Sequence, residues 1–368
     1  MPNTLLFVGC YTQTGSHSAA ALPLGISSFD FDDATGRLTH LDTVTGTDNP
    51  SFLAISSDCR TLYAANELVD PNEGLISAYR ISSSGKLSYL NRQPSRGCLP
   101  AHLCLDRTES YVLAVNYSAG PMTDLPNRSL VIYPRGTEGE LLAPVAEVSH
   151  SGQGPNPLRQ ERSHPHSVQT TPDNRFAVVA DLGIDKLVVY KFDAGTGGIG
   201  LHSEVCLPPG SGPRHFVFHP RLPFAYLVNE LTSTIVTLAF DVAAGVFSVG
   251  STVSTLPAGV TAVNLSSESA FGPDAHFLYV GNRGHDSIAC FKIDSRSGAA
   301  TLASVTASGG NTPRHFAIDP SGAFLAVANQ NSDCISVFRL DRETGVPHPI
   351  QNVAKVARPT CVVFGRTA

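Results

Sequence analysis

Short runs in which apolar and polar residues alternate follow one another along the whole chain, separated by turns rich in glycine, proline, asparagine and aspartate. One such run is ISVFRLD at 335–341, which is rich in β-branched and aromatic residues. Alternation with a period of two is typical of β-strands that bury one of their faces. The pattern predicts an all-β protein made of short strands joined by turns.

Two distant stretches nearly repeat one another: GPRHFVFHPRLPFAYLVNE at 212–230 and TPRHFAIDPSGAFLAVANQ at 312–330. Each contains Pro-Arg-His-Phe, a first apolar run, a turn with proline, a second apolar run, and an asparagine followed by Glu or Gln. Self-similarity with a period of about 20–50 residues indicates a repeat architecture. The first apolar run recurs seven times, beginning near positions 49, 99, 164, 212, 259, 312 and 358.

Each repeat unit contains four expected strands. A third strand such as LISAYRI or ISVFRLD follows the second, and a turn with glycine leads to the fourth. Four strands in a unit of roughly 50 residues predict the blade of a β-propeller. The second strands are expected to end at Cys10, Asn66, Asn116, Asp181, Asn229, Asn282 and Asn329.

The two ends of the chain complete each other. The sequence begins within a second strand, LLFVGCY, and ends on a first strand, PTCVVFG. Sharing one blade between the termini closes the ring and hides two strand edges. We therefore expect one domain over residues 1–368, a seven-bladed β-propeller with four-stranded antiparallel blades and a closing blade shared by the N- and C-terminal strands. An open β-solenoid or two β-sandwiches explain the divided blade less well.

One face of this ring is expected to carry the function. First strands begin there and the antiparallel second strands end there, around the central channel. The recurring Asn or Asp at second-strand ends indicates turn capping, whereas departures from the repeat indicate function. Clustered cations at a channel mouth are costly unless an anion or carboxylates balance them, so we expect an anion-binding and acid–base site, with a structural ion-pair network as the alternative. The departures are Arg214-His215, Arg314-His315, the HPH at 164–166, Glu67 and Glu230.

Composition narrows the possible partners and location. Charged residues make up 15% of the chain and the net charge is −6, so the basic footprint of a nucleic-acid surface is absent from the sequence. The N-terminal residues have no signal-peptide pattern, and no apolar run reaches the length of about 18 residues that a membrane span needs. The eight cysteines include no C-x-x-C pair, which favours reduced thiols. We expect a cytoplasmic protein, a monomer or weak homodimer, without nucleic-acid or membrane partners.

Two other chemistries fit the sequence poorly. His164 and His166 lie two residues apart on one side of a strand, as metal ligands do, but no third ligand accompanies them at a diagnostic spacing. The G-x-S-x-G motif of serine hydrolases is missing from the sequence as well. We therefore expect neither a metal nor a covalent serine mechanism.

The ordered motifs FVGCYT at 7–12, HPHSV, GPRHFVFHP, YLVNEL, the last PRH and RPTCVVF give the chain a resemblance that covers nearly its whole length. It resembles the seven-bladed β-propeller lactonases, which include propeller-type 6-phosphogluconolactonases and carboxy-cis,cis-muconate cyclases. The resemblance implies an active-site cluster of His166, Arg214, Glu230 and Arg314, and no cofactor or metal. Further substrate-binding residues are expected at the same face: His164, His215, His315, Glu67 and Arg283.

The expected reaction is hydrolysis of a small anionic sugar lactone, with 6-phosphogluconolactone as the expected substrate. Glu230 is the preferred base for the attacking water and His166 the alternative, while Arg214 and Arg314 bind the substrate anion and stabilise developing charge. The loop at 150–163 is expected to shape substrate choice. Two alternatives stay open: a cyclase that closes a muconate-type lactone, and a non-catalytic propeller that binds a protein partner.

Overall fold

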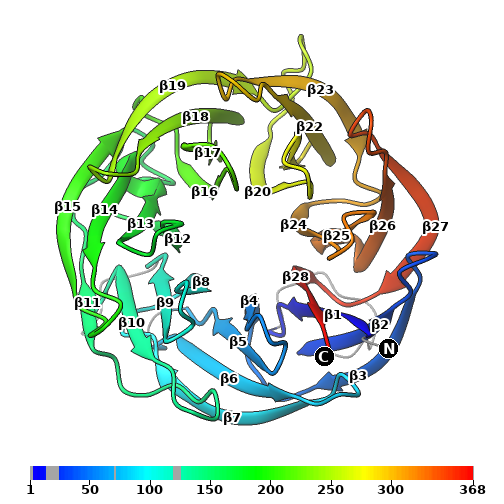
Figure 1. Cartoon of the computed structure of the whole chain (residues 1–368), viewed down its shortest axis with the longest axis horizontal. Coiled ribbons are helices and arrows are strands. Elements are labelled where there is room, and N and C mark those ends of the chain that lie inside the picture. The colour runs from blue at the N-terminus through cyan, green and yellow to red at the C-terminus, as the bar shows by residue number, and fades with distance from the viewer. Residues whose placement is uncertain (1–2, 14–24, 70–71, 119–125, 368) are drawn as a thin grey trace.

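The computed structural model describes residues 3–13, 25–69, 72–118 and 126–367. In this part of the chain, seven four-stranded antiparallel sheets surround a central axis, as Figure 1 shows. Two single-turn 3-10 helices, η1 (Leu182–Ile184) and η2 (Gln330–Ser332), are the helical elements of the described residues. The predicted all-β, seven-bladed propeller is confirmed.

Every blade has the same order of strands from the axis outward. The innermost strands are β4 (Pro50–Ile55), β8 (Pro100–Leu105), β12 (Pro165–Thr170), β16 (Pro213–Phe218), β20 (Leu265–Phe271), β24 (Pro313–Ile318) and β28 (Pro359–Arg366). Beside them lie β5 (Thr61–Asn66), β9 (Tyr111–Asn116), β13 (Phe176–Asp181), β17 (Phe224–Asn229), β21 (Phe277–Arg283), β25 (Phe324–Asn329) and β1 (Thr4–Cys10).

Third strands and edge strands complete the blades toward the rim (Figure 1). The third strands are β6 (Leu75–Ile81), β10 (Leu130–Pro134), β14 (Lys186–Phe192), β18 (Thr234–Asp241), β22 (Ser287–Ile293), β26 (Cys334–Leu340) and β2 (Ile26–Phe31). The edge strands are β7 (Leu87–Pro94), β11 (Ala146–Val148), β15 (Ile199–Cys206), β19 (Val246–Ser254), β23 (Ala300–Ala307), β27 (Pro347–Lys355) and β3 (Leu38–Val44).

The closing blade has the predicted composition. Strand β28 pairs antiparallel with β1, so that Thr4 faces Arg366, and β2 and β3 complete the sheet. The terminal residues are joined as well, because the Asn3 amide donates to Thr367 Oγ1 at 2.9 Å and the Thr367 amide donates to the Asn3 carbonyl at 3.0 Å. One predicted boundary is wrong: the first strand expected to begin at 259 begins at Leu265.

Neighbouring blades are joined by apolar packing and by a recurring tyrosine. The apolar residues buried between sheets include Phe31 and Phe324, whose rings meet edge to face at 5.5 Å. A tyrosine of the second strand donates its hydroxyl hydrogen to the carbonyl of the turn glycine in the next blade, as Tyr63 does to Gly139 at 2.7 Å. That glycine has a φ of 92°, a conformation that other residues rarely adopt. Turn glycines of the repeat therefore accept the tyrosine hydrogen bonds that join neighbouring blades.

The register of the innermost strands defines two sets of equivalent residues around the axis. In β4, Pro50 pairs with Asn66 and Phe52 pairs with Ala65, so the residue between them bulges out of the ladder. All seven innermost strands have this irregularity near their start. We call the bulged residues the first ring: Ser51, Ala101, His166, Arg214, Ser267, Arg314 and Thr360. We call the residues after them the second ring: Phe52, His102, Ser167, His215, Glu268, His315 and Cys361.

Candidate active site

The two rings and the ends of the second strands lie on one face of the propeller, which we call the hub face. The recurring Asn residues at second-strand ends hold loop backbone there. The Asn66 side-chain amide donates to the Asp48 carbonyl at 2.7 Å, and that of Asn116 donates to the Ser95 carbonyl at 2.7 Å. Asn329 donates to the Ser308 carbonyl at 3.1 Å. These contacts agree with turn capping by the recurring Asn residues. The side chains that depart from the repeat are therefore the ones left to supply chemistry on the hub face.

Glu230, one residue beyond β17, is surrounded by three guanidinium groups. Its Oε2 lies 3.0 Å from Arg214 Nε and 2.6 Å from Arg283 Nη2, while its Oε1 accepts from Arg159. The Glu230 side chain is 2% exposed and that of Arg214 is 3% exposed. Three positive charges therefore face one negative charge in a largely dehydrated place. This arrangement leaves an excess of positive charge that a bound anion would balance.

The charges around Glu230 determine its protonation. Burial alone would raise the pKa of this carboxyl group, but Arg283, Arg214 and Arg159 lower it to about 2. The carboxylate consequently stays ionised at neutral pH, with both oxygens engaged by guanidinium groups. A carboxylate so stabilised is a weak proton acceptor. The geometry thus favours a role in holding the arginines over the role of base that the sequence suggested for Glu230.

Two donors of Arg214 lack a hydrogen-bond acceptor among the described residues. Its Nη1 and Nε are buried and make no hydrogen bond among the described residues, because the Nε–H is poorly aligned with Glu230 despite the short distance. Burial, with the nearby charge of Arg283, lowers the pKa of Arg214 to about 9, so the group is still charged at pH 7. A buried, charged donor without a partner is costly unless a ligand supplies the acceptor.

Arg314 is held by a different set of partners. Its Nη2 donates to the hydroxyl of Tyr11 at 2.7 Å, and its guanidinium carbon lies 5.1 Å from the centre of the Tyr11 ring. The Tyr11 hydroxyl in turn donates to Glu67 at 3.0 Å, and Glu67 Oε2 lies 3.8 Å from Arg314 Nη2. The tyrosine of the FVGCYT motif therefore bridges two predicted site residues.

His164 supports the loop at 150–163. Its Nδ1 donates to the Tyr117 carbonyl at 2.7 Å, its Nε2 lies 3.0 Å from Glu161 Oε2, and its ring stacks on the Tyr117 ring at 4.3 Å. Both ring nitrogens are thus engaged by protein groups. The loop also supplies Arg159 to Glu230, so His164 helps to place a charged side chain of the hub face. A direct contact of His164 with substrate stays a prediction.

The second ring contains a carboxylate between two imidazoles. Glu268 Oε2 lies 2.9 Å from His215 Nδ1 and 2.9 Å from His315 Nε2. These three residues occupy the same ring position in three consecutive blades, on β16, β20 and β24. The ring of Phe52 completes the cluster, with its centre 5.9 Å from that of His215 and 5.4 Å from that of His315. Side chains of the second ring are therefore packed against one another across the axis.

The imidazoles nearest the arginines are neutral at pH 7. The centre of the His166 ring lies 5.2 Å from that of His215. Burial, together with the charge of Arg214, lowers the pKa of His166 well below its usual value. Burial also lowers the pKa of His215, to about 4, although Glu268 opposes the shift. His166 Nδ1 and His215 Nε2 are buried and have no hydrogen-bond partner in the described part of the chain.

The structure brings the predicted residues into connected groups. Arg214, Glu230 and Arg283 are in direct contact, His166 lies beside His215, and Arg314 lies near Glu67. The sequence interpretation omitted Glu268, Arg159 and Tyr11 from the site. Glu268 was overlooked because the start of its strand was placed six residues too early, at 259 instead of Leu265. Arg159 lies in a loop outside the repeat, so no periodic signal marked it.

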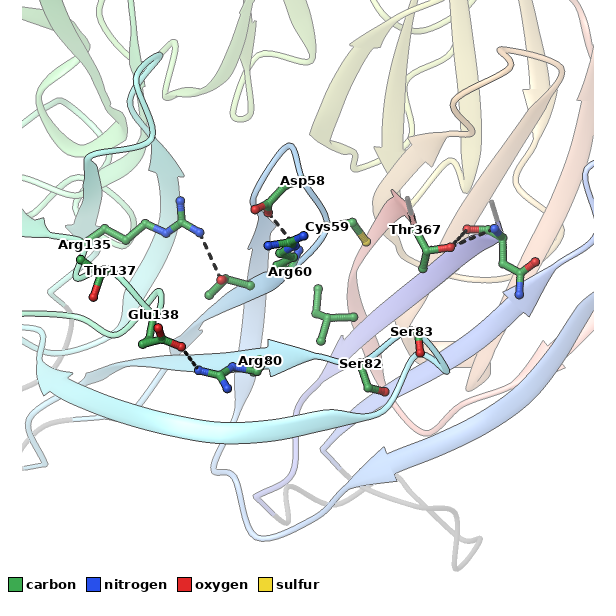
Figure 2. A pocket seen from close by; sticks show the side chains of 13 residues that line it. Asp58, Cys59, Arg60, Arg80, Ser82, Ser83, Arg135, Thr137, Glu138 and Thr367 are labelled. Atoms are coloured by element: carbon green, nitrogen blue, oxygen red, sulfur yellow. Dashed lines mark hydrogen bonds and ion pairs between the residues drawn. The ribbon is translucent and has the colours of Figure 1, made fainter. Parts of the chain in front are cut away.

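Two hollows lie outside the group of arginines around Glu230. A pocket of about 660 Å³ on the opposite face is polar, and two of its arginines lie near carboxylates. Arg80 pairs with Glu138 of the lining at 2.7 Å (Figure 2). Arg135 pairs with Glu109, a residue outside the lining, at 3.6 Å. A cavity of about 510 Å³ extends from Phe52 and His102 of the second ring to the turns of the opposite face. Neither hollow has an excess of positive charge like that around Glu230.

Two other structural features are absent from the described residues. No group of three or more His, Cys, Asp or Glu side chains there is arranged to hold a metal ion. No helix there is long and apolar enough to cross a membrane. Six of the eight cysteines are buried.

The family model described as "Lactonase, 7-bladed beta-propeller" matches residues 5–364. The chain belongs to this lactonase family. The resemblance inferred from the motifs is thereby confirmed. Lactone chemistry is the activity for which this family is named.

Individual lactonases and related structures are similar over nearly the whole chain. The 6-phosphogluconolactonase of Bacillus subtilis is 35% identical over 312 residues, which cover 84% of this chain and 83% of that protein. The structure of the periplasmic gluconolactonase of Pseudomonas aeruginosa is 31% identical, with a TM-score of 0.88 and 99% of each chain covered. A structure from Lactobacillus plantarum is 33% identical, with a TM-score of 0.87 and 99% of each chain covered.

Proposed function

We propose that this lactonase hydrolyses 6-phosphogluconolactone to 6-phosphogluconate. The observation that carries the proposal is the cluster of Arg159, Arg214 and Arg283 around the single carboxylate of Glu230. Such a cluster suits an anionic substrate, because guanidinium groups bind phosphate and carboxylate oxygens with two parallel hydrogen bonds. The name of the Bacillus subtilis relative, 6-phosphogluconolactonase, supports this substrate.

The site residues have the following roles in the proposal. Arg214 directs its unsatisfied donors to the substrate anion or to the carbonyl oxygen, which becomes negatively charged when water attacks the lactone. Arg314, stacked on Tyr11, adds a second cationic group to the site. Glu230 keeps the guanidinium groups in place, and the neutral His166 positions the attacking water. The lactone C–O bond then breaks, and the ring oxygen leaves as a hydroxyl group.

Replacement of Arg214 tests the assignment. We expect Arg214→Ala to lower kcat/KM for 6-phosphogluconolactone by about 100- to 1,000-fold, because removing one donor to a developing oxyanion has this effect in other enzymes. The matched control is Arg80→Ala, which removes an exposed arginine on the opposite face and should leave turnover unchanged. Wild-type rates in both Arg214→Ala and Glu230→Ala would refute the site.

The phosphate group of the substrate is the part of the proposal that the relatives leave most open. The Pseudomonas aeruginosa structure is named a gluconolactonase, which favours the unphosphorylated lactone as a second candidate. Comparison of kcat/KM for glucono-δ-lactone and its 6-phosphate on the same preparation decides between them. If the arginines bind the phosphate, the phosphorylated lactone is strongly preferred and the preference is lost in Arg214→Ala.

The remaining alternatives are separated by the same assays. Lactonisation of a muconate-type dicarboxylate uses a small anion too, and formation of a lactone in place of its loss would favour it. A non-catalytic scaffold gives no reason for charge to cluster at the hub, whereas four arginines lie there close to carboxylates. Metal-independent catalysis, a cytoplasmic location and a monomeric or weakly dimeric state stay predictions.

A further inference from the structure

The second ring contains an imidazole that a carboxylate holds in one orientation. Glu268 Oε2 lies 2.9 Å from His215 Nδ1, and Glu268 Oε1 accepts from the Ser269 amide at 2.8 Å. The side chains of Glu268 and His215 are 10% and 4% exposed. The carboxylate is therefore fixed by backbone and is close enough to fix the ring in turn.

The contact between these two groups determines which nitrogen of His215 carries a proton. A carboxylate only accepts hydrogen bonds, so the nitrogen that faces it must be Nδ1–H. In the neutral ring, Nε2 then has a free lone pair, and it makes no hydrogen bond among the described residues. Nearby His166 also has an unpartnered nitrogen, but no carboxylate contacts it in this part of the chain.

We propose that His215 is the general base of the lactonase reaction and that Glu268 is its positioning residue. In this step, which rests on the proposed function, a water O–H bond breaks and its proton moves to His215 Nε2. The water oxygen forms a bond to the lactone carbonyl carbon. The C–O bond of the ring then breaks, and the ring oxygen takes the proton back from Nε2, so the imidazole returns to its neutral state.

The charges that face His215 make its basicity depend on substrate. Glu268 faces Nδ1, the rings of Phe52, His102 and His166 lie within 6 Å, centre to centre, and Arg214 precedes it in the chain. Burial and Arg214 lower the pKa of His215, and the neighbouring His315 lowers it further. An anion bound to the arginines cancels part of this positive field and raises the pKa. His215 should therefore be a stronger base in the substrate complex than in the free enzyme.

Replacement of the carboxylate by an amide tests the pair. Glu268→Gln can present an N–H to Nδ1, which moves the ring proton to Nε2 and removes the lone pair. We expect kcat to fall by about 100- to 10,000-fold with KM changed little, and Glu268→Asp to recover part of the rate. The matched control is Glu109→Gln, which alters an ion pair with Arg135 on the opposite face and should leave both constants unchanged.

The pH profile of the wild-type enzyme gives a measurement free of folding effects. A base must be unprotonated, so activity is lost as pH falls through its pKa. The acid limb of kcat/KM reports the free enzyme and that of kcat reports the substrate complex. We expect the limb of kcat to lie at higher pH. Coincident acid limbs, or a wild-type kcat in folded Glu268→Gln, would overturn the proposal.

A spectroscopic measurement separates this proposal from the proposed function. Nitrogen-15 NMR of the His215 ring should show the proton on Nδ1 in the wild type and on Nε2 in Glu268→Gln, with His215→Gln used to assign the signals. If the wild type opens neither gluconolactone nor its 6-phosphate, the proposed function fails. The position of the His215 ring proton then remains as the test of whether Glu268 orients His215. A proton on Nε2 in the wild type would then refute it.

Discussion

Three carboxylates of the hub face differ in what each one holds. Glu67 accepts from Tyr11 and lies near Arg314, Glu230 contacts three guanidinium groups, and Glu268 bridges two imidazoles. Their chemical consequences differ accordingly. Glu230 concentrates positive charge, whereas Glu268 fixes the protonation state of His215. In the proposed mechanism, identical residue types thus serve anion binding and proton transfer through their neighbours.

The pairing of Glu230 predicts how stability depends on pH. The folded protein lowers the pKa of Glu230 from 4.5 to about 2, so its contribution to the free energy of unfolding is complete above about pH 5. That contribution is lost as pH falls from 4.5 toward 2. We expect Glu230→Gln to lower the free energy of unfolding by about 3 kcal/mol at pH 7, because unbalanced charges stay buried. Urea unfolding between pH 2 and 7 measures the difference, which should shrink at the acid end.

The control for this measurement is Glu138→Gln. Glu138 pairs with Arg80, but both side chains are more than half exposed, so a change below about 0.5 kcal/mol is expected. A Glu230→Gln variant with a constant stability difference across this pH range would show that the arginines do not hold the carboxylate as described.

Residues that break the repeat could be predicted as site residues, because a propeller places equivalent positions on one face. This reasoning selected Arg214, Glu230 and Arg314, and the structure brings all three to the hub face. It did not reveal the partners, since a contact such as Glu268 with His215 joins residues 53 positions apart on different blades. The sequence likewise did not reveal every guanidinium group that surrounds Glu230, because Arg159 comes from a loop that the repeat does not contain.

At the scale of the strand, the sequence was most informative where alternation was regular. The segments LISAYRI and ISVFRLD are predicted as third strands and correspond to β6 and β26. The error at β20 has a physical cause. It lacks the proline that begins the other six innermost strands, and Ser266, which pairs with Asn282, takes the place in front of the bulge.

The approach of two blades at Gly9 leads to an element-scale prediction. A Cβ at Gly9 of β1 would lie 2.2 Å from the Pro50 carbonyl oxygen of β4. Backbone atoms cannot move away cheaply, so we expect Gly9→Ala to lower the free energy of unfolding by about 1–3 kcal/mol. Because Pro50 begins an innermost strand, the variant should also reduce lactonase turnover. Urea unfolding and steady-state kinetics provide the two measurements.

Gly200→Ala in β15 is the matched control, since a Cβ there meets nothing within 4 Å. It should leave the free energy of unfolding unchanged or raise it slightly, because alanine restricts the unfolded chain. Equal stability of the two alanine variants would mean that β1 and β4 are not as close as described.

At the scale of the whole molecule, the closing blade ties both chain ends together. Removal of residues 359–368 would leave β1 without its partner β28 and expose the edge of β1 that faces the axis. We expect this truncated protein to lose cooperative unfolding and to aggregate. Circular dichroism during heating and gel filtration measure the two effects.

A circular permutant separates strand pairing from chain continuity. The termini can be joined by a short linker, because Asn3 and Thr367 are already hydrogen-bonded. New ends between Val242 and Ala243 lie in an exposed turn that joins β18 to β19, on the face opposite the hub. This permutant keeps all seven blades and should retain cooperative unfolding and turnover. Its failure to fold would show that the order of the strands along the chain matters beyond their pairing.

The bulge near the start of every innermost strand has a consequence for how such a protein changes over generations. Each blade presents one side chain to each ring at a fixed register, so a single substitution alters the chemistry at the axis without moving the others. Histidine, glutamate, phenylalanine, serine and cysteine already occupy equivalent places in the second ring. New substrate preferences can therefore arise one blade at a time on an unchanged scaffold.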